Sequence, residues 1–347
     1  MRVQRVGIGL AARCARRAER VGFQAVIAYF PGNIGSRKTM RSLSRSSARW
    51  PLTATLFLAA AGTAAADTPD WVKSYSVSGR ANVHVHTNDG SVRVITSDTQ
   101  QVEFRVKTEG SGWGFGFGDD SHIDSRQDGD LVELNAHVRN YVIGFNNRHT
   151  EIEVSMPKNS DLQLETSDGS IDISAVNGDV RANTSDGSIK VAQVNGTIEV
   201  SSSDGSIEAR TLKGTVKLRT SDGSIRATEL DGRCEASSSD GSVRVEGRFD
   251  ALDVHSGNGS VTTRVASGSS ISSAWQVSSS DGSVEVVLPP DFKTNLDVST
   301  SDGHITLDLP VQVQGELSKS HVHGLLNGGG PPFRIHSSDG SIRLSGA

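Results

Sequence analysis

Large apolar residues recur at four fixed positions around a Ser-Asp-Gly-Ser motif. Counted from the Asp of the motif, these positions are minus six, minus four, plus three and plus five. The copy at Asp168 fills them with Leu162, Leu164, Ile171 and Ile173. A spacing of two on each side of the motif is the period of a strand with alternate side chains buried. Each copy therefore predicts two short strands joined by an Asp-Gly turn.

The motif repeats at intervals of 18 residues through the middle of the chain. The regular copies are Asp168, Asp186, Asp204, Asp222 and Asp240, followed by Asn258, and looser copies lie at Asp89, Asp281, Asp302 and Asp339. The Gly of each motif is expected to supply the positive φ angle that a tight turn needs. A second turn recurs midway, as in Val176-Asn177-Gly178 and Val194-Asn195-Gly196. Two strands and two turns per 18 residues make one coil of a solenoid.

Outward-facing charges distinguish stacked coils from independent hairpins, which could use the same turns. At position minus five the side chains alternate in sign from one copy to the next: Arg181, Glu199, Lys217 and Glu235. Stacked strands place equivalent residues about 4.8 Å apart, where opposite charges pair and like charges repel. The sequence therefore predicts an all-β fold, a single-chain parallel β-solenoid (β-helix) with coils of about 18 residues and two short strands per coil.

The solenoid is expected to have a less regular start and loops near its end. Residues 100–157 break the period but keep strand patterns, which predicts an N-terminal β capping section at 67–157 ahead of repeats in 158–347. Its strand patterns cover 102–107, 131–138 and 151–156, and longer spacing predicts loops near 267–273, 289–294 and 310–332. Hydrophobic residues are only 35% of the chain and aromatics 5%, which suits a thin repetitive core.

The N-terminal residues have the pattern of an export signal. Residues 40–66 place Arg41, Arg45 and Arg49 before an apolar stretch and a small-residue cleavage site at 64–66, so they are predicted to be a secretory signal peptide. The apolar stretch is too short to favour a spanning helix, and an uncleaved membrane anchor is the alternative. Residues 1–39 are interpreted as an upstream extension or a disordered segment.

Charge and cysteine content limit the partners of the exported chain. Residues 1–66 hold eleven of the 35 Lys and Arg and one of the 40 Asp and Glu, so 67–347 carry 24 basic and 39 acidic residues, a formal charge of −15. This balance disfavours nucleic acid. Cys234 is alone after residue 66 and falls in an inward column, so a small buried residue is expected rather than a disulfide or reactive thiol. No stable membrane span is expected after signal cleavage.

The repeated Ser-Asp-Gly-Ser-Ile/Val, the Val-Asn-Gly half-turns and the segment Glu151-Ile-Glu-Val-Ser-Met-Pro157 resemble the bacterial putative-adhesin family of exported β-strand-repeat proteins. The resemblance covers about residues 75–347. It implies a β-helical fold and a place at the cell envelope, and it implies no established molecular activity.

The Asp column is the strongest candidate for bound ions. Equal charges stack at Asp168, Asp186, Asp204, Asp222 and Asp240. A calcium ladder would offset their repulsion. The alternative is that each Asp accepts hydrogen bonds from turn amides and neighbouring Ser hydroxyls, with the edge exposed to water and salt. No cofactor is predicted apart from this calcium option.

Aromatic and imidazole side chains give two further candidate sites. Trp113, Phe115 and Phe117 lie in a Gly-rich segment and either bind a glycan or a partner or cap the core. The pairs His84-x-His86 and His321-x-His323 place two imidazoles on one strand face, as surface residues or as half of a zinc or copper site.

The predicted function is an exported structural or interaction module of the cell envelope, periplasmic or extracellular, that binds protein or polysaccharide and is not an enzyme. Loops on a rigid scaffold are the expected binding regions. The alternatives are a regulator of envelope stress and a polysaccharide lyase or hydrolase on a β-helix. Tight turns through the regular half disfavour the enzyme, since enzymatic β-helices carry long loops over one face.

Overall fold

The computed structural model describes residues 71–109, 112–115, 122–137, 143–146, 149–313 and 318–347. These residues form strands and turns without a helix, which confirms the all-β prediction. The described part therefore contains no helix long and apolar enough to cross a membrane. The predicted upstream extension and signal peptide lie outside the described residues.

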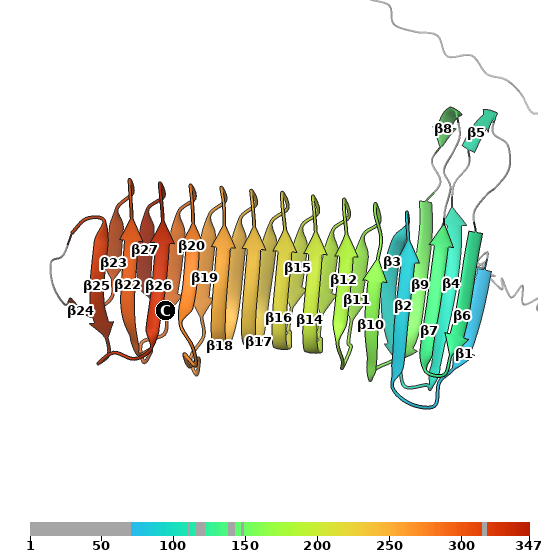
Figure 1. Ribbon diagram of the computed structural model, residues 1–347, viewed down its shortest axis with the longest axis horizontal. Helices are drawn as coiled ribbons and strands as arrows, with labels where there is room; N and C mark the ends of the chain where they lie inside the picture. Colours follow the sequence, from blue (N-terminus) through green and yellow to red (C-terminus); the bar gives the residue numbers. More distant parts are fainter. Residues whose placement is uncertain (1–70, 110–111, 116–121, 138–142, 147–148, 314–317) are drawn as a thin grey trace, which may run out of the picture. The chain divides into compact units, whose positions relative to one another are not determined.

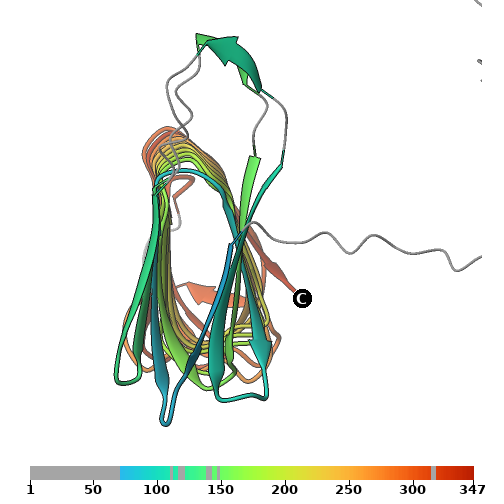
Figure 2. The same cartoon turned by 90° about the vertical axis from the view of Figure 1, so that its right-hand side faces the viewer.

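Each regular repeat contributes one strand to each of two walls that enclose the core (Figures 1 and 2). The first wall holds the strands that precede the Asp-Gly turn, and the second holds those that follow it. The first-wall strands are β2 (Ala81–Thr87), β10 (Ser160–Glu165), β12 (Val180–Thr184), β14 (Asn195–Ser202), β16 (Lys213–Thr220), β20 (Trp275–Ser279), β22 (Thr294–Thr300) and β26 (Pro332–Ser337). The second-wall strands are β3 (Ser91–Ser97), β11 (Ile171–Ser174), β13 (Ile189–Ala192), β15 (Ile207–Arg210), β19 (Val261–Val265), β21 (Val284–Leu288), β23 (Ile305–Asp308) and β27 (Ile342–Gly346). β17 (Ile225–Ser238) and β18 (Val243–Ser256) pair in both walls.

Neighbouring repeats pair in parallel and in register. Val180 lies opposite Ile198 in the first wall, and Ile189 lies opposite Ile207 in the second, so each residue faces its equivalent 18 positions later. The charges at minus five meet as the sequence predicted. Glu199 pairs with Arg181 at 3.1 Å and with Lys217 at 3.5 Å, measured from nitrogen to oxygen.

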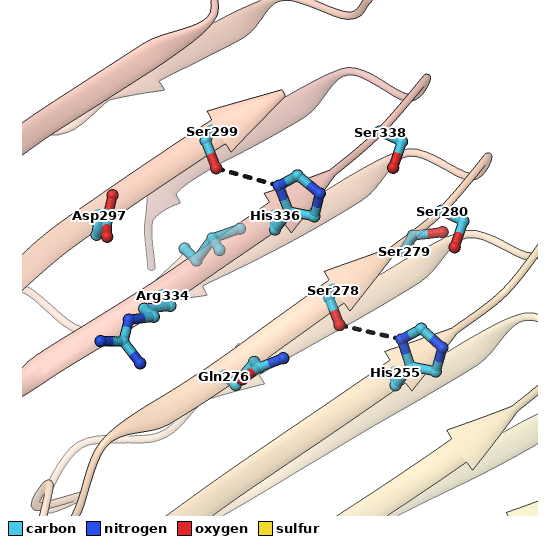
Figure 3. Close-up of a pocket in the computed structure, with 11 residues that line it drawn as sticks. His255, Gln276, Ser278, Ser279, Ser280, Asp297, Ser299, Arg334, His336 and Ser338 are labelled. Atoms are coloured by element: carbon cyan, nitrogen blue, oxygen red, sulfur yellow. Dashed lines mark hydrogen bonds between the residues drawn. The ribbon is translucent and has the colours of Figure 1, made fainter. Parts of the chain in front are cut away.

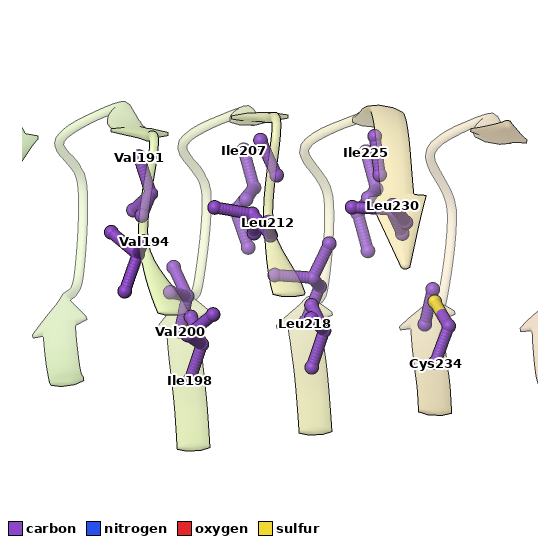
Figure 4. Close-up of a cluster of buried hydrophobic side chains, with 14 of the residues drawn as sticks. Val191, Val194, Ile198, Val200, Ile207, Leu212, Leu218, Ile225, Leu230 and Cys234 are labelled. Atoms are coloured by element: carbon purple, nitrogen blue, oxygen red, sulfur yellow. The ribbon is translucent and has the colours of Figure 1, made fainter. Parts of the chain in front are cut away.

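The core consists of columns of inward-facing side chains, and each repeat contributes one residue to each column (Figure 4). The four predicted positions are buried in the regular copies, whereas Ile305 and Leu307 of the copy at Asp302 are half-buried. A fifth column comes from the half-turns. That fifth column consists of Val176, Val194, Leu212 and Leu230. Cys234 is 2% exposed within its column, in the way expected of a small apolar residue.

The conformation expected for the motif glycines is wrong for most copies. Among the glycines of the ten motif copies, all within the described residues, Gly90 alone has a positive φ. Positive φ angles occur instead at the half-turns, for example 57° at Gln193 and 112° at Gly214. The motif glycines are required by close packing, because a Cβ on Gly205 would lie 1.9 Å from the carbonyl oxygen of Gly187.

The N-terminal residues add antiparallel strands to the first repeat. The strand patterns expected near 102–107, 131–138 and 151–156 are confirmed as three of these strands. The added strands are β1 (Trp71–Ser76), β4 (Gln101–Glu109), β6 (His122–Asp128), β7 (Leu131–His137) and β9 (His149–Pro157). β7 and β9 pair in parallel with the first repeat, whereas β1–β4, β4–β9 and β6–β7 are antiparallel. A separate two-stranded antiparallel sheet pairs β5 (Gly112–Phe115) with β8 (Ile143–Asn146).

The last repeat does not stack in chain order. β26 pairs with β20 on one side and β22 on the other, and β27 lies likewise between β21 and β23. The final repeat is therefore inserted between two earlier ones. The stretch expected to be a loop at 310–332 contains two strands, β24 (Val311–Val313) and β25 (His321–Leu326), which continue the first wall in antiparallel fashion.

Candidate binding surface

The five Asp residues of the column all lie exposed at the turn that joins the two walls. Their backbone amides are fixed by the previous repeat, as when Asp186 and Asp204 donate to the carbonyls of Ser167 and Ser185 at 3.0 and 2.9 Å. Beyond the last Asp, the Asn258 side-chain amide donates to the Asp240 carboxylate. No group of three or more His, Cys, Asp or Glu side chains within the described ranges could hold a metal ion. The calcium ladder stays a prediction.

A buried hydroxyl column runs beside the Asp residues, at position minus two, and was not predicted. Thr184 Oγ1 lies 3.1 Å from the carbonyl oxygens of Ser167 and Gly169, to which it donates, and accepts from the Gly187 amide at 3.3 Å. The same donation to the glycine carbonyl of a neighbouring repeat recurs along the stack at Ser202, Thr220, Ser238, Ser256, Ser279, Thr300 and Ser337. The sequence signal was present, since each of these copies has Ser or Thr two residues before the Asp or Asn.

The predicted aromatic site is only partly described. Trp113 and Phe115 belong to β5, where they pair with Phe145 and Ile143 of β8. Phe117 lies outside the described residues. The contribution of these three residues to binding stays a prediction.

The imidazole pairs lie next to carboxylates. His84 Nδ1 is 3.7 Å from Glu133 Oε1, and His86 Nδ1 is 3.6 Å from Glu165 Oε2. His321 Nε2 is 4.0 Å from Asp297 Oδ1. Each of these contacts joins one imidazole to one carboxylate at the surface.

Cys234 has the surroundings of an unreactive thiol. Burial, with smaller contributions from Glu235 and Asp253, raises the pKa of Cys234 to about 12. The thiolate is the nucleophilic form, so this side chain is not a candidate for chemistry at ordinary pH.

Three hollows open on the outer face of the first wall. One of them lies across β18, β20, β26 and β22 and has a volume of about 480 Å³ (Figure 3). Its lining is polar apart from Ile335, whose own side chain is buried in the core. Arg334 and Asp297 are the charged members of the lining that carry permanent opposite charges.

Serine and histidine alternate through this hollow, because neighbouring strands bring them into register. His255 Nδ1 lies 3.0 Å from Ser278 Oγ, and His336 Nδ1 lies 3.1 Å from Ser299 Oγ (Figure 3). In the part of the chain that the structure describes, neither imidazole is hydrogen-bonded to a carboxylate. A nucleophilic triad needs such an orienting acid on the second ring nitrogen. The hollow therefore offers hydrogen-bond donors and acceptors to a ligand, without the arrangement of a hydrolytic triad.

This hollow was not predicted from the sequence. Binding was predicted in irregular loops, whereas the side chains that line the hollow stand on strands, mainly at positions minus five and minus three. The available signal was the recurrence of Ser and His alone at position minus three in the last repeats: Ser237, His255, Ser278, Ser299 and His336.

Comparison with solved structures gives distant likenesses. The chain is similar to a "putative cell adhesion protein" from Clostridium sporogenes, with 12% identity, 81% of this chain and 100% of the other covered, and a TM-score of 0.23. It is also similar to a "putative adhesin" from Bacteroides fragilis (10% identity, 80% and 96% covered, TM-score 0.34) and to a "putative lipid binding protein" from Parabacteroides distasonis (13% identity, 80% and 97% covered, TM-score 0.34). We draw no structural or functional conclusion from similarity this low.

No curated protein matches the chain. A family model described as Toastrack DUF4097 matches residues 117–345, more than half of the 347 residues. The matched range contains every regular Ser-Asp-Gly-Ser repeat, which confirms the family resemblance expected from that motif. The chain belongs to the Toastrack DUF4097 family.

Proposed function

We propose that this protein is an exported interaction module of the cell envelope that binds protein or polysaccharide on the outer face of its first wall, without catalysis. The observation that carries the proposal is the set of polar hollows on that face, which stand on hydrogen-bonded strands rather than on loops. A rigid surface with fixed donors and acceptors suits recognition, because little conformational entropy is lost when a ligand binds.

The scaffold of this module is proposed to be a single-chain parallel β-solenoid with two strands per coil. In-register parallel pairing of equivalent residues 18 positions apart supports this classification. Residues 158–347 form the repeats in this proposal, and residues 67–157 cap their N-terminal end. The antiparallel strands β1, β4 and β6 support the capping role, because an antiparallel partner interrupts the parallel edge that another coil would extend.

Export and surface binding can be tested in one experiment on the whole protein. We expect the chain expressed in bacteria to reach the periplasm or medium and to begin at Asp67 by N-terminal sequencing. Labelled exported protein should then bind intact bacterial cells saturably. Periodate treatment of the cells should abolish binding to a polysaccharide, and protease treatment should abolish binding to a protein.

Two results would contradict this proposal. Retention of the chain in the cytoplasm would rule out the envelope location, and an absence of saturable binding would rule out the interaction role. Shortening of a bound polysaccharide, measured by size-exclusion chromatography, would instead favour the carbohydrate-active enzyme.

A further inference from the structure

We propose that the hollow across β18, β20, β26 and β22 binds an acidic polysaccharide, with Arg334 pairing with a carboxylate of the polymer and the serine and histidine row hydrogen-bonding to its hydroxyls. This inference rests on the proposed binding function and names the ligand class for one surface.

The row at position minus three lacks acidic side chains over six neighbouring strands. Strand pairing places the members of this row in one line across the wall. Serine and histidine alternate along it: Ser237, His255, Ser278, His336, Ser299 and His321. Residues 67–347 carry a formal charge of −15, whereas this row places no carboxylate on six neighbouring strands. An anionic polymer lying along the row therefore meets no carboxylate within it, and the carboxylates of Asp253 and Asp297 lie to one side, at position minus five.

Arg334 supplies a cation without an ion-pair partner among the described residues. Its side chain is exposed within the hollow, and no described carboxylate lies within ion-pair or hydrogen-bond distance of it. Asp297 lies opposite Arg334 in the strand register, but its carboxylate is near His321, with Oδ1 4.0 Å from Nε2. A guanidinium left free in this way can bind a ligand carboxylate in a bidentate manner.

The lining favours a glycan over an acyl chain or an amphipathic helix. Apolar ligands need exposed apolar surface in the site, and here the apolar member, Ile335, is turned into the core. Hydroxyl, imidazole and amide groups are instead presented by Ser299, His336 and Gln276. These groups can both donate to and accept from sugar hydroxyls.

The direction of the row suits a polymer. The row crosses the strands, so its members follow the direction in which repeats stack, and like residues recur every second strand, roughly 10 Å apart. A chain of sugars lying along the stack would meet equivalent donors repeatedly. The neutral-to-basic row extends on both sides of the hollow, to Ser237 in β17 and His321 in β25, which leaves room for several sugar units.

A second hollow on the same wall provides an internal control. It is lined by Asp161, Asp179 and Glu199, and its Arg181 is held by Glu199 through hydrogen bonds of 3.1 and 3.2 Å. Arg181 occupies position minus five, as Arg334 does, but its charge is already neutralised. Replacing Arg334 is therefore expected to weaken the binding of an acidic ligand, whereas replacing Arg181 is expected to leave its affinity unchanged.

The test is calorimetric titration of the whole protein with oligogalacturonate, with neutral dextran oligosaccharides of matched length as the reference ligand. We expect saturable binding of oligogalacturonate, weakened by added NaCl, and at least tenfold weaker binding of dextran. Arg334→Gln should weaken oligogalacturonate binding about tenfold, since a charge-assisted hydrogen bond is lost. Arg334→Lys should restore part of it, and His336→Gln should weaken it less than Arg334→Gln.

Arg181→Gln is the matched control and should leave the affinity unchanged. Both arginines are exposed, so each variant should keep the melting temperature of the unaltered protein. Equal binding of dextran and oligogalacturonate, or equal losses from Arg334→Gln and Arg181→Gln, would overturn the inference. If the protein binds cells saturably but not oligogalacturonate, the proposed function stands and this ligand class is wrong. If it binds neither, both are wrong.

Discussion

At the residue scale, the motif glycines are fixed by contact with the preceding repeat. The carbonyl oxygen of each motif glycine points at the Cα of the next one, and a Cβ there would lie between 1.9 and 2.1 Å from that oxygen at Gly187, Gly205, Gly223 and Gly241. Real side chains do not approach a carbonyl so closely. The glycines therefore set the distance between repeats.

Gly205→Ala is expected to destabilise the protein by about 2 to 3 kcal/mol, because the Cβ must push two repeats apart. The measurement is the urea midpoint followed by circular dichroism. Ser203→Ala, in the same turn but exposed, is the control and should change the free energy of unfolding by less than about 0.5 kcal/mol. Equal stability of Gly205→Ala and the unaltered chain would show that the glycine column does not set the repeat spacing.

The buried hydroxyl column provides hydrogen-bond partners for backbone carbonyl and amide groups that water cannot reach. Thr184 is 2% exposed. Its hydroxyl donates to carbonyls of the preceding repeat and accepts from the Gly187 amide of the repeat to which Thr184 belongs. Buried carbonyl and amide groups without partners are costly. A polar residue at this inward position therefore stabilises the turn.

Thr184→Val keeps the shape of the side chain and removes its hydroxyl. We expect it to lower the free energy of unfolding by about 1 to 3 kcal/mol, the cost of leaving these groups unsatisfied. Thr184→Ser retains the hydroxyl and should cost less, about 0.8 kcal/mol for the lost methyl group. Chemical denaturation of both variants decides the matter, and a smaller loss in Thr184→Val than in Thr184→Ser would contradict a polar role.

At the scale of the elements, backbone hydrogen bonds between repeats hold the turns that carry the Asp column. The amides of Asp186, Asp204, Asp222 and Asp240 donate to carbonyls one repeat earlier, so the turn conformation is held by the backbone. Their carboxylates are exposed, where salt screens the repulsion between neighbours.

We therefore expect calcium to give no saturable heat in calorimetry and to leave the melting temperature unchanged against a chelator. A ligand of the native state would raise the melting temperature by mass action. Asp204→Asn is the matched variant and should behave like the unaltered chain in both conditions. A saturable heat that Asp204→Asn reduces would show that the column is a calcium ladder.

At the scale of the whole molecule, the order of repeats in space differs from their order in the chain. The repeat at 332–346 lies between those at 275–288 and 294–308, which do not pair with each other. Phe333 of the inserted strand packs on Trp275 with ring centroids 5.6 Å apart. The repeat at 294–308 thus depends on residues that follow it in sequence.

Removal of residues 331–347 should destabilise the strands of the repeat at 294–308, although the truncated chain still contains that repeat. We expect its amides to exchange with deuterium far faster than in the whole chain, because their parallel partners are gone. Amides at 180–220 serve as the internal control and should keep their protection. Unchanged protection at 294–308 would mean that this repeat can stack on 275–288 directly, as chain order would suggest.

The sequence by itself determined the local structure of this protein. A period of two around a repeated turn specifies the strands, their buried faces and the two turns per repeat, since each depends on residues within 18 positions. Alternating charges at Arg181, Glu199 and Lys217 also specified which repeats are neighbours in the regular half. The buried hydroxyl column was equally visible at Thr184 and its equivalents, but its role required knowledge of which carbonyls it meets.

Only the tertiary structure decided the neighbours at the C-terminal end and the candidate binding surface that they create. Repeats with the same inward pattern can stack on one another in any order, so the pattern cannot state that 332–346 enters between 275–288 and 294–308. The hollow exists because that insertion brings His336 and Arg334 between Ser278 and Ser299. Residues far apart in the chain meet there through backbone pairing. Which strands pair over so long a separation in sequence is decided only when the whole chain folds.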